Sequence, residues 1–392
     1  MSISNTVRVK NATAASDYWI QYNRTKSWPA FQPAAPELRV VDLFSGCGGL
    51  TLGAFIACEQ LNRQLKVCLA ADVWSEALEV YKHNFSHVLD YSTTADLSTL
   101  VVNPGSAALS PTGIELAENL GQVNVIVAGP PCQGHSDLNN SSRRDDPRNL
   151  LYTIPVAFAL HLRPEIVLIE NVPTVIHAEH NVVSSAQQLL INSGYAVLEI
   201  VANAQNFGLP QTRKRHIMLA SRTLSKMEMI DRLSKLETRS DDVQLWDFIS
   251  DLENEAEDKD LLITKRSKIS PDNIRRINYL FDADVFDLPN EHRPPCHRDK
   301  EHSYVSMYGR LNHSKPAQTI TSGFGSMGQG RFVHPTQRRM ITPHEAARIQ
   351  GFPDYFDFNP AGKITALREM IGNAVPPPVA AVLLTALLSG SR

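Results

Sequence analysis

The sequence predicts an α/β protein with a Rossmann-like, doubly wound, mainly parallel sheet and a smaller second domain. Short apolar runs at 38–44, 67–71 and 125–128 each end in polar residues, glycine or proline, which is typical of buried strands in a parallel sheet. A glycine-rich turn and a helical pattern follow the first run directly. With 392 residues and 43% hydrophobic content, the chain is long enough to form two domains.

Charge and cysteine content limit the class of protein. The 38 basic and 41 acidic residues leave a formal charge of −3, so a polyanionic partner would have to bind a local basic face. Five cysteines form an odd set without CxxC spacing, which favours a reducing compartment over a disulfide framework. The N-terminus lacks a signal-peptide core and no apolar run reaches about 18 residues, so we expect a cytoplasmic protein outside the membrane.

The first elements indicate a candidate cofactor site. Residues 1–36 are polar and show no periodicity, which predicts an arm lying on the surface. The strand at 38–44 then runs into the turn 45–49, and a helix is expected over 50–61. Glycines in such a turn allow close approach of a ligand to the backbone and to the free N–H groups of the helix, although the pattern also fits a simple tight turn.

Two acidic residues follow the next strands. Asp72 ends the second strand, where nucleotide-binding sites bind a ribose diol, but it could equally cap a helix over 75–84. Asp96 follows a weaker strand signal and is weak evidence by itself.

The segment 125–136 combines a buried strand with a stiff loop that carries one cysteine. Two prolines restrict the backbone and hold Cys132 at the crevice where open α/β sheets bind ligands. A lone cysteine is usually an inert, buried residue, but Pro-Pro-Cys-Gln directly after a strand favours a reacting thiolate.

A second strand pattern, 164–173, places a carboxylate near that cysteine. Glu170 is expected beside the tip of the strand that precedes Cys132, and Asn171 could orient the loop. Thiolate addition at C6 of a pyrimidine makes C5 nucleophilic, and protonation at N3 assists the addition. The pair therefore fits transfer of a methyl group from a sulfonium donor to pyrimidine C5.

These motifs together resemble the signature motifs of the DNA cytosine-5 methyltransferases. The resemblance rests on Asp42-Leu-Phe-Ser-Gly-Cys-Gly-Gly49, the Pro-Pro-Cys-Gln loop and Glu-Asn-Val at the end of the later strand. Three further segments extend it over about residues 39–222 and 339–380: a Gln-x-Arg-x-Arg motif at 211–215, a Thr-x-x-Glu-Ala-Ala-Arg helix at 342–348 and a last motif at 372–378. Thr342, Pro343 and Glu345 are also ordinary helix-start chemistry.

The resemblance implies a methyltransferase of the prokaryotic restriction-modification type. Its activity would be transfer of a methyl group from S-adenosylmethionine to C5 of cytosine in a specific duplex sequence, by base flipping and thiolate addition at C6. The implied catalytic residues are Cys132, Glu170, Arg213 and Arg215. The implied S-adenosylmethionine site comprises Phe44, Ser45, Gly46, Cys47, Gly48, Gly49, Asp72, Val73, Asp96, Pro131, Leu151, Asn373 and Val375.

Two positions depart from the common family pattern. Asp72 replaces a usual glutamate, which shortens the reach to a ribose, and His135 replaces a usual aromatic or small residue. Neither change removes a reacting group.

Residues 223–338 match the motifs poorly and predict a target-recognition domain. It would follow an arm (1–36) and a catalytic and cofactor-binding domain (37–222), and precede a hinge with a helix (339–369) and a returning C-terminal segment (370–392). The acidic stretch 241–260 should face away from DNA, whereas the arginine-rich stretch 301–348 should face it. The glycine-rich segment 322–330 could approach a groove or simply form a flexible loop. The expected DNA contacts are Gln133, Ser136, Gln211, Arg310, Lys315, Gln329 and Arg331.

Three alternatives remain open at this point. His292, Cys296, His297 and His302 could bind zinc, but their spacing is not that of a zinc finger and the family requires no metal, so we expect none. A transfer-RNA cytosine-5 methyltransferase would share the scaffold, but its usual Cys-Phe-Thr signature is absent. A catalytically silent DNA-binding regulator is disfavoured by the intact Cys132, Glu170 and Arg213. We expect a monomer acting on double-stranded DNA, with any cognate restriction endonuclease a separate protein.

Overall fold

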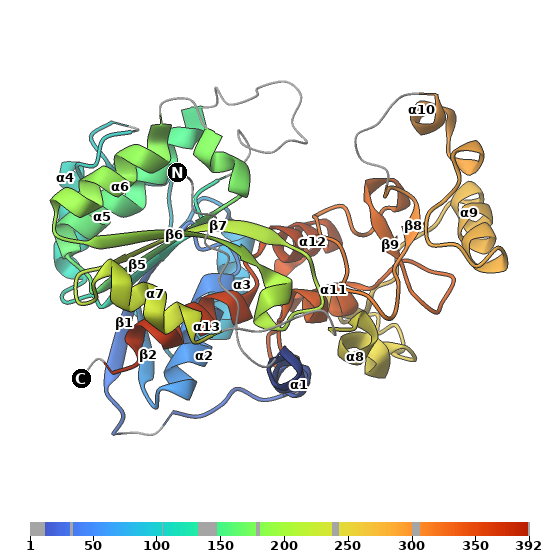
Figure 1. The fold of residues 1–392 in the computed structure, drawn as a ribbon, viewed down its shortest axis with the longest axis horizontal. Coiled ribbons are helices and arrows are strands. Elements are labelled where there is room, and N and C mark those ends of the chain that lie inside the picture. Colours follow the sequence, from blue (N-terminus) through green and yellow to red (C-terminus); the bar gives the residue numbers. More distant parts are fainter. Residues whose placement is uncertain are drawn as a thin grey trace.

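A seven-stranded sheet forms the centre of the larger part of the molecule (Figure 1). The structure is a computed structural model, and it describes residues 12–31, 34–103, 105–131, 147–177, 181–236, 243–299 and 306–390. The strand order is β3-β2-β1-β4-β5-β7-β6, in which β7 is antiparallel to both neighbours and the other pairings are parallel. The predicted doubly wound, mainly parallel sheet is therefore confirmed. The strands are β1 Glu37–Leu43, β2 Gln64–Asp72, β3 Ser92–Thr94, β4 Val125–Ala128, β5 Ile166–Asn171, β6 Ala196–Asn203 and β7 Lys214–Ser221.

Helices cover both faces of this sheet, and each face has its own hydrophobic core (Figure 1). Successive side chains of a strand point to opposite faces, so Val40 of β1 joins one core and Val41 joins the other. This arrangement explains why the strands are apolar throughout rather than alternating. One face carries α2 Gly49–Gln60, α3 Ser75–Phe85, α7 Lys226–Ser234 and α13 Pro377–Leu388, and the other carries α4 Pro111–Asn119, α5 Ile154–Leu162 and α6 Val182–Asn192.

The N-terminal arm is more ordered than its sequence predicts. Its residues Ala12–Asn23 form α1, and Trp19 is buried with its indole N–H donating to the Phe207 carbonyl at 2.9 Å. The Tyr22 hydroxyl donates to Glu59 Oε2 at 2.9 Å and lies 2.9 Å from the Tyr355 hydroxyl. The lack of periodicity gave no sign of this helix, because aromatic anchors rather than a periodic apolar face attach the segment to the fold.

A smaller part of the molecule lies beside the sheet, and α11 Pro343–Gln350 and α12 Ile364–Asn373 lie between the two (Figure 1). The described elements of the smaller part are α8 Leu245–Ile249, α9 Pro271–Asp282, α10 Pro295–Arg298, β8 Gly309–Arg310 and β9 Arg331–Val333. Helix α7, which the predicted boundary at 222/223 assigns to the target-recognition domain, packs on β6 and α13 of the sheet. The sequence alone did not indicate that α7 packs against the sheet before the chain enters the smaller part of the molecule.

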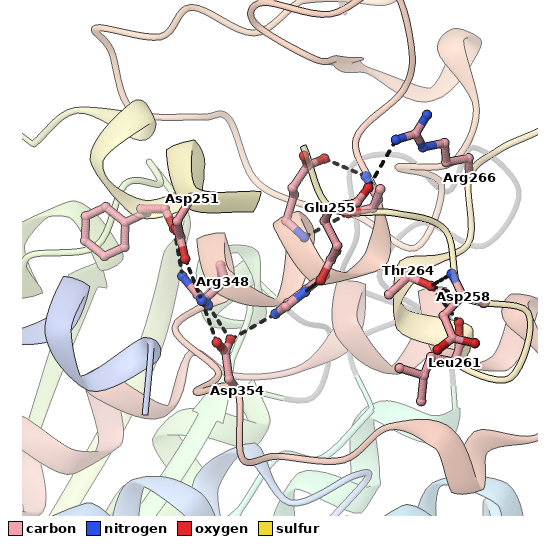
Figure 2. A network of polar contacts seen from close by, with 12 residues as sticks. Asp251, Glu255, Asp258, Leu261, Thr264, Arg266, Arg348 and Asp354 are labelled. Carbon is pink, nitrogen blue, oxygen red and sulfur yellow. Dashed lines mark hydrogen bonds and ion pairs between the residues drawn. The ribbon is translucent and has the colours of Figure 1, made fainter. Parts of the chain in front are cut away.

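A buried charge network joins the smaller part to α11 (Figure 2). The Arg348 guanidinium, 1% exposed, bonds Asp354 at 2.5 Å and Asp251 at 3.2 Å. His344 lies between two carboxylates, with Nδ1 2.7 Å from Glu255 and Nε2 2.9 Å from Asp354. Burial alone would lower the pKa of His344, but its two carboxylate partners raise it to about 9. The same contacts, against the opposing effect of burial, lower the pKa of Asp354 to about 2.

Among the residues that the structure describes, one helical stretch, Ile364–Leu388, has the length and composition to cross a membrane, although 72% of its most apolar window is buried in the protein. The stretch comprises α12 and α13; α13 packs in the core beside α2, and α12 packs against α11. Its apolar character is therefore that of core helices.

Candidate functional site

A cavity opens at the carboxyl ends of the central strands. Its volume is about 490 Å³, and it lies where β1 and β4 are neighbours and the strand order reverses. Ligands of open α/β sheets bind at such a switch point, and the volume lies in the range of small-molecule sites. The lining residues come from four strand ends, from the start of β7 and from α12 with the turn after it: Phe44, Ser45, Gly46, Cys47, Gly49, Leu50, Asp72, Val73, Trp74, Gly129, Pro130, Pro131, Glu170, Val172, Arg213, Arg215, Glu369, Met370, Asn373, Ala374 and Val375.

The turn after β1 has an unusual backbone. Phe44 has φ 57°, a left-handed conformation that is uncommon for a bulky residue, and Gly48 has φ 97° immediately before α2. A Cβ at Gly48 would lie 2.4 Å from the Phe85 ring, and a Cβ at Gly49 would lie 2.6 Å from the Val375 carbonyl oxygen. These glycines therefore let the turn pack closely against α3 and against the returning C-terminal segment.

A buried hydrogen-bond chain supports this turn from below. Asp42 Oδ2 accepts a hydrogen bond from the Thr51 hydroxyl at 2.7 Å, and that hydroxyl lies 2.7 Å from the Tyr81 hydroxyl. Burial raises the pKa of Asp42 to about 8, with the Thr51 hydrogen bond opposing the shift. The chain links β1 to α2 and α3, and sequence reasoning noted Asp42 only as part of a motif.

Asp72 serves the turn and also faces the cavity. Its Oδ2 accepts from the Gly46 N–H at 2.7 Å, and its Oδ1 accepts from the Trp74 N–H at 2.8 Å, directly before α3. Burial raises the pKa of this carboxyl, and the backbone hydrogen bonds oppose that shift. The position of Asp72 is thus compatible with both predicted roles, at a helix start and at a cofactor site. Val73 beside it is 70% exposed and lines the same cavity.

Glu170 is the penultimate residue of β5 and lies beside the end of β4, as expected from the sequence. Only 7% exposed, it faces the cavity, and its Oε1 accepts from Arg215 Nε at 2.7 Å. Within the described part of the chain, no hydrogen bond reaches its second carboxylate oxygen. Asn171 donates from Nδ2 to the Pro130 carbonyl at 3.2 Å, so it does contact the loop after β4.

Arg213 and Gln211 join three segments that are distant in sequence. Arg213 is 2% exposed and donates from Nη1 to the carbonyls of Ile320 and Gly372, each at 3.0 Å. Gln211 is fully buried, donates from Nε2 to Gln350 Oε1 at 2.9 Å, and accepts from the Ile320 N–H at 2.9 Å. Its side chain is therefore enclosed in the interface rather than directed to solvent, which corrects the expectation that Gln211 contacts DNA.

The cysteine that the sequence singles out, Cys132, lies outside the described residues, as do Gln133, His135 and Ser136. Among the described cysteines, Cys47 lines the cavity, but burial raises the pKa of its thiol to about 12. Cys58 is buried with a pKa of about 12 for the same reason, and Cys296 is exposed far along the chain in the smaller part. Burial also raises the pKa of the Cys68 thiol. Because the thiolate is the nucleophile, none of these three buried thiols is suited to covalent chemistry.

Most of the predicted cofactor residues surround this cavity, and three do not line it. A Cβ at Gly48 would meet the Phe85 and Tyr81 rings rather than the cavity. Asp96 is exposed and caps a 3₁₀ turn by accepting from the Ser98 N–H. Leu151 packs against the core on the sheet face that carries α4, α5 and α6. Pro131, Asn373 and Val375 line it. Sequence reasoning missed Trp74, Val172, Glu369 and Met370, and their helical or strand-end positions gave no separate signal.

The expected DNA-facing arginines are largely paired with acids. Each forms an ion pair with a carboxylate of the same half of the chain: Arg310 with Asp284 at 2.7 Å, Arg331 with Asp287 at 2.5 Å, Arg338 with Asp282 at 2.6 Å, Arg339 with Glu345 at 2.6 Å and Arg348 with Asp354. Arg310, buried, also stacks on Phe281 and Phe286. Lys315 and Gln329 are exposed. The arginine-rich stretch is thus largely neutralised by its own fold.

The histidine-cysteine group of the smaller part is dispersed. His292 stacks on Tyr279 with ring centroids 3.8 Å apart, and His297 lies 5.4 Å from the Tyr308 ring. His302 lies outside the described residues, within which no group of three or more potential metal ligands occurs.

Comparisons with known proteins agree with the motifs. The family model for the C-5 cytosine-specific DNA methylase matches residues 38–389. The type II methyltransferase M1.BsuMI of Bacillus subtilis (strain 168) is 40% identical over 376 residues, which are 95% of this chain and 86% of the relative. M.DdeI of Desulfomicrobium norvegicum is 28% identical over 88% of this chain and 87% of the relative. A crystal structure titled "putative DNA modification methyltransferase encoded within prophage" (E. coli) matches the fold with TM-score 0.58 and 24% identity, covering 89% of this chain and 98% of that chain.

Proposed function

Since the chain belongs to the C-5 cytosine-specific DNA methylase family, we propose that the cavity at the ends of β1, β2, β4 and β5 holds both the methyl donor and the target base. The protein methylates C5 of cytosine in DNA, and S-adenosylmethionine is the donor. The observation that supports the proposal most directly is that the cavity is lined both by the turn after β1 and by Glu170. Donor and acceptor would thus meet in one space.

The residues of the first half of the cavity fit S-adenosylmethionine. Asp72 offers a carboxylate to a ribose diol, while the exposed Val73 side chain offers an apolar surface to a purine. The donor supplies a methyl group on a sulfonium. Asn373 and Val375 would close the site, because Gly49 already packs against the Val375 backbone. Asp96 and Leu151 are not included in this proposal.

The second half of the cavity fits an extruded cytosine. We assign Glu170 to N3 of the base, where a shared proton would promote addition at C6, and Cys132 to the nucleophile that adds there. Arg215 would orient the Glu170 carboxylate through its 2.7 Å contact. Arg213 would act indirectly, by fixing the start of β7 to the segments that carry Ile320 and Gly372. A stacked base cannot reach such a cavity, so the base must leave the duplex.

The finer assignment is a type II methyltransferase of a restriction-modification system, as M1.BsuMI is named. In this proposal, recognition of a specific sequence resides in the smaller part of the molecule, approximately residues 243–338, rather than beginning at 223. The enzyme would act as a monomer on double-stranded DNA in the cytoplasm, and a cognate endonuclease would be a separate protein.

Covalent trapping tests the proposal. Duplex DNA carrying 5-fluorocytosine at the target should form a denaturation-resistant adduct with the wild-type protein and S-adenosylmethionine, because fluorine blocks the final loss of the C5 proton. Cys132→Ala should form none, whereas Cys47→Ala should still form it, since the Cys47 thiol is buried with its pKa raised to about 12. An adduct that persists in Cys132→Ala, or that maps to Cys47 or Cys296, would contradict the assignment.

A further inference from the structure

The end of helix α1 lies beside α8 of the smaller part (Figure 1). Arg24, the first residue after α1, donates from Nη2 to the Asp247 carbonyl at 2.9 Å. The same guanidinium forms an ion pair with Asp251 at 3.1 Å. Asp251 also bonds the buried Arg348 at 3.2 Å, so one carboxylate joins the N-terminal arm to the charge network of Figure 2.

The middle of α1 contacts the segment that leads into β7. The buried Trp19 donates its indole N–H to the carbonyl of Phe207, which ends a 3₁₀ turn. From there the chain runs into Arg213 and the start of β7. Within this segment the Pro210 carbonyl accepts from the Ala317 N–H at 2.8 Å. The segment that α1 holds on the sheet side is therefore one that also bonds the smaller part.

Backbone hydrogen bonds fix the arm at the turn after α11. The Asp354 N–H donates to the Asn23 carbonyl at 2.9 Å, and the Tyr355 N–H donates to the Thr25 carbonyl at 3.0 Å. Asn23 also donates from Nδ2 to the Arg348 carbonyl at 3.3 Å. With 12 residues, α1 is about 18 Å long, and its own backbone bonds make it stiff. It therefore acts as a rigid spacer between the sheet and α8.

We propose that Trp19 and Arg24 are positioning residues for the reaction: through α1 they hold the smaller part in line with the cavity. The proposal rests on the assignment of sequence recognition to the smaller part. A recognition surface that is aligned before DNA binds needs less ordering on binding. The extruded base must also enter the cavity in the correct position, and a small displacement is costly to the reaction. Neither residue lines the cavity, so both act through the segments that they hold.

Arg24→Met tests the contact with the smaller part. The arginine is 40% exposed and its ion pair contributes little to global stability, so the fold should survive its loss. Bisulfite sequencing of DNA from cells that express the wild type identifies the target duplex for the assay. KM for that duplex should rise about 3- to 5-fold, with a smaller change in kcat. The Kd of a non-target duplex should stay at the wild-type value, because non-specific binding to phosphates requires no alignment with the cavity.

Lys26→Met is the matched control for the loss of charge. Lys26 is an exposed residue of the same arm and forms no ion pair with any described residue. Its substitution should leave KM for the target duplex within about 1.5-fold of wild type. The affinity for S-adenosylmethionine and the urea midpoint should stay at wild-type values in both variants.

Hydrogen exchange separates this role from a general loss of stability. Trp19→Phe removes the donor to Phe207 but keeps a ring, and it should raise KM in the same way as Arg24→Met. In both variants the Ala317 N–H should exchange about 3- to 10-fold faster, because its bond to Pro210 joins the two parts. Amides of β1 and β4 should exchange at wild-type rates. Arg24→Met decides the outcome if Trp19→Phe is unstable, since Arg24 lies outside the core.

Three outcomes would overturn the proposal. The first is a wild-type KM for the target duplex in Arg24→Met. The second is a loss of S-adenosylmethionine affinity that matches the rise in KM. The third is a lower slope of log Kd against log salt in Arg24→Met, which would mean that Arg24 contacts a phosphate directly. Failure of the recognition assignment is distinguishable, because exchange of residues 243–338 with those of a relative would then leave the target sequence unchanged.

Discussion

The cavity and the smaller part of the molecule use their polar residues in opposite ways. Around the cavity, Asp72 and Glu170 are held by backbone or arginine contacts yet still face open space. In the smaller part, arginines such as Arg310 and Arg338 are matched to aspartates of the same region. Polar side chains that face a cavity indicate a ligand-binding site, whereas side chains that are fully engaged in ion pairs indicate surface and interface structure.

The largest expected effect is a loss of catalytic rate when a carboxylate that faces the cavity is replaced. Glu170→Gln keeps the side-chain volume but removes the ability to share a proton, so kcat should fall by about 10²- to 10⁴-fold. Single-turnover methylation with tritiated donor measures this loss. The Kd of S-adenosylmethionine should change much less, because Glu170 lies in the half of the cavity assigned to the base. Activity within about tenfold of wild type would remove Glu170 from the acid role.

The sequence predicted the residues at the strand ends around the cavity well, for a physical reason. The carboxyl ends of neighbouring parallel strands meet at one edge of a sheet, so the residues after 43, 72, 128 and 170 had to converge once the strands were located. The capping box of α11, with Thr342 and Glu345, was also predicted and is present, because it depends only on residues three apart.

The smaller part was predicted poorly, because ion pairs form there between residues that are far apart in the sequence. Net basic charge between 301 and 348 suggested a DNA surface, but Arg331 meets Asp287 across 44 positions and Arg310 meets Asp284 across 26. No local pattern identifies such partners. The burial of Gln211 and the helix α1 were missed for the same reason, since both depend on segments elsewhere in the chain.

A smaller effect should follow from removing the carboxylate at the end of β2. Asp72→Ala removes a charged hydrogen-bond acceptor, which should weaken S-adenosylmethionine binding by about 2 kcal/mol, or roughly 30-fold. Titration calorimetry measures this change. Asp96→Ala is the control, because Asp96 is exposed, caps a turn and does not line the cavity, so its loss should leave the affinity within about twofold. Equal losses in the two variants would show that Asp96 does contribute to the site.

The smallest effect should come from the buried charge network around Arg348 and His344. It should appear as a dependence of the free energy of unfolding on pH. The pKa of His344 is about 9 in the folded protein, above its ordinary value of about 6.5 in an unfolded chain, because Asp354 and Glu255 outweigh the effect of burial. Its stabilising contribution should therefore be complete below pH 6.5 and be lost as the pH rises through about 9. Between pH 7 and 8 the free energy of unfolding should fall by about 1 kcal/mol from this residue, which urea denaturation at the two pH values measures. His344→Gln should remove that part of the pH dependence, while His83→Gln, at an exposed contact with Asp357, should leave it intact. If the free energy of unfolding fell equally in wild type and in His344→Gln over this interval, the imidazole between Glu255 and Asp354 would not carry the charge that binds the smaller part to α11.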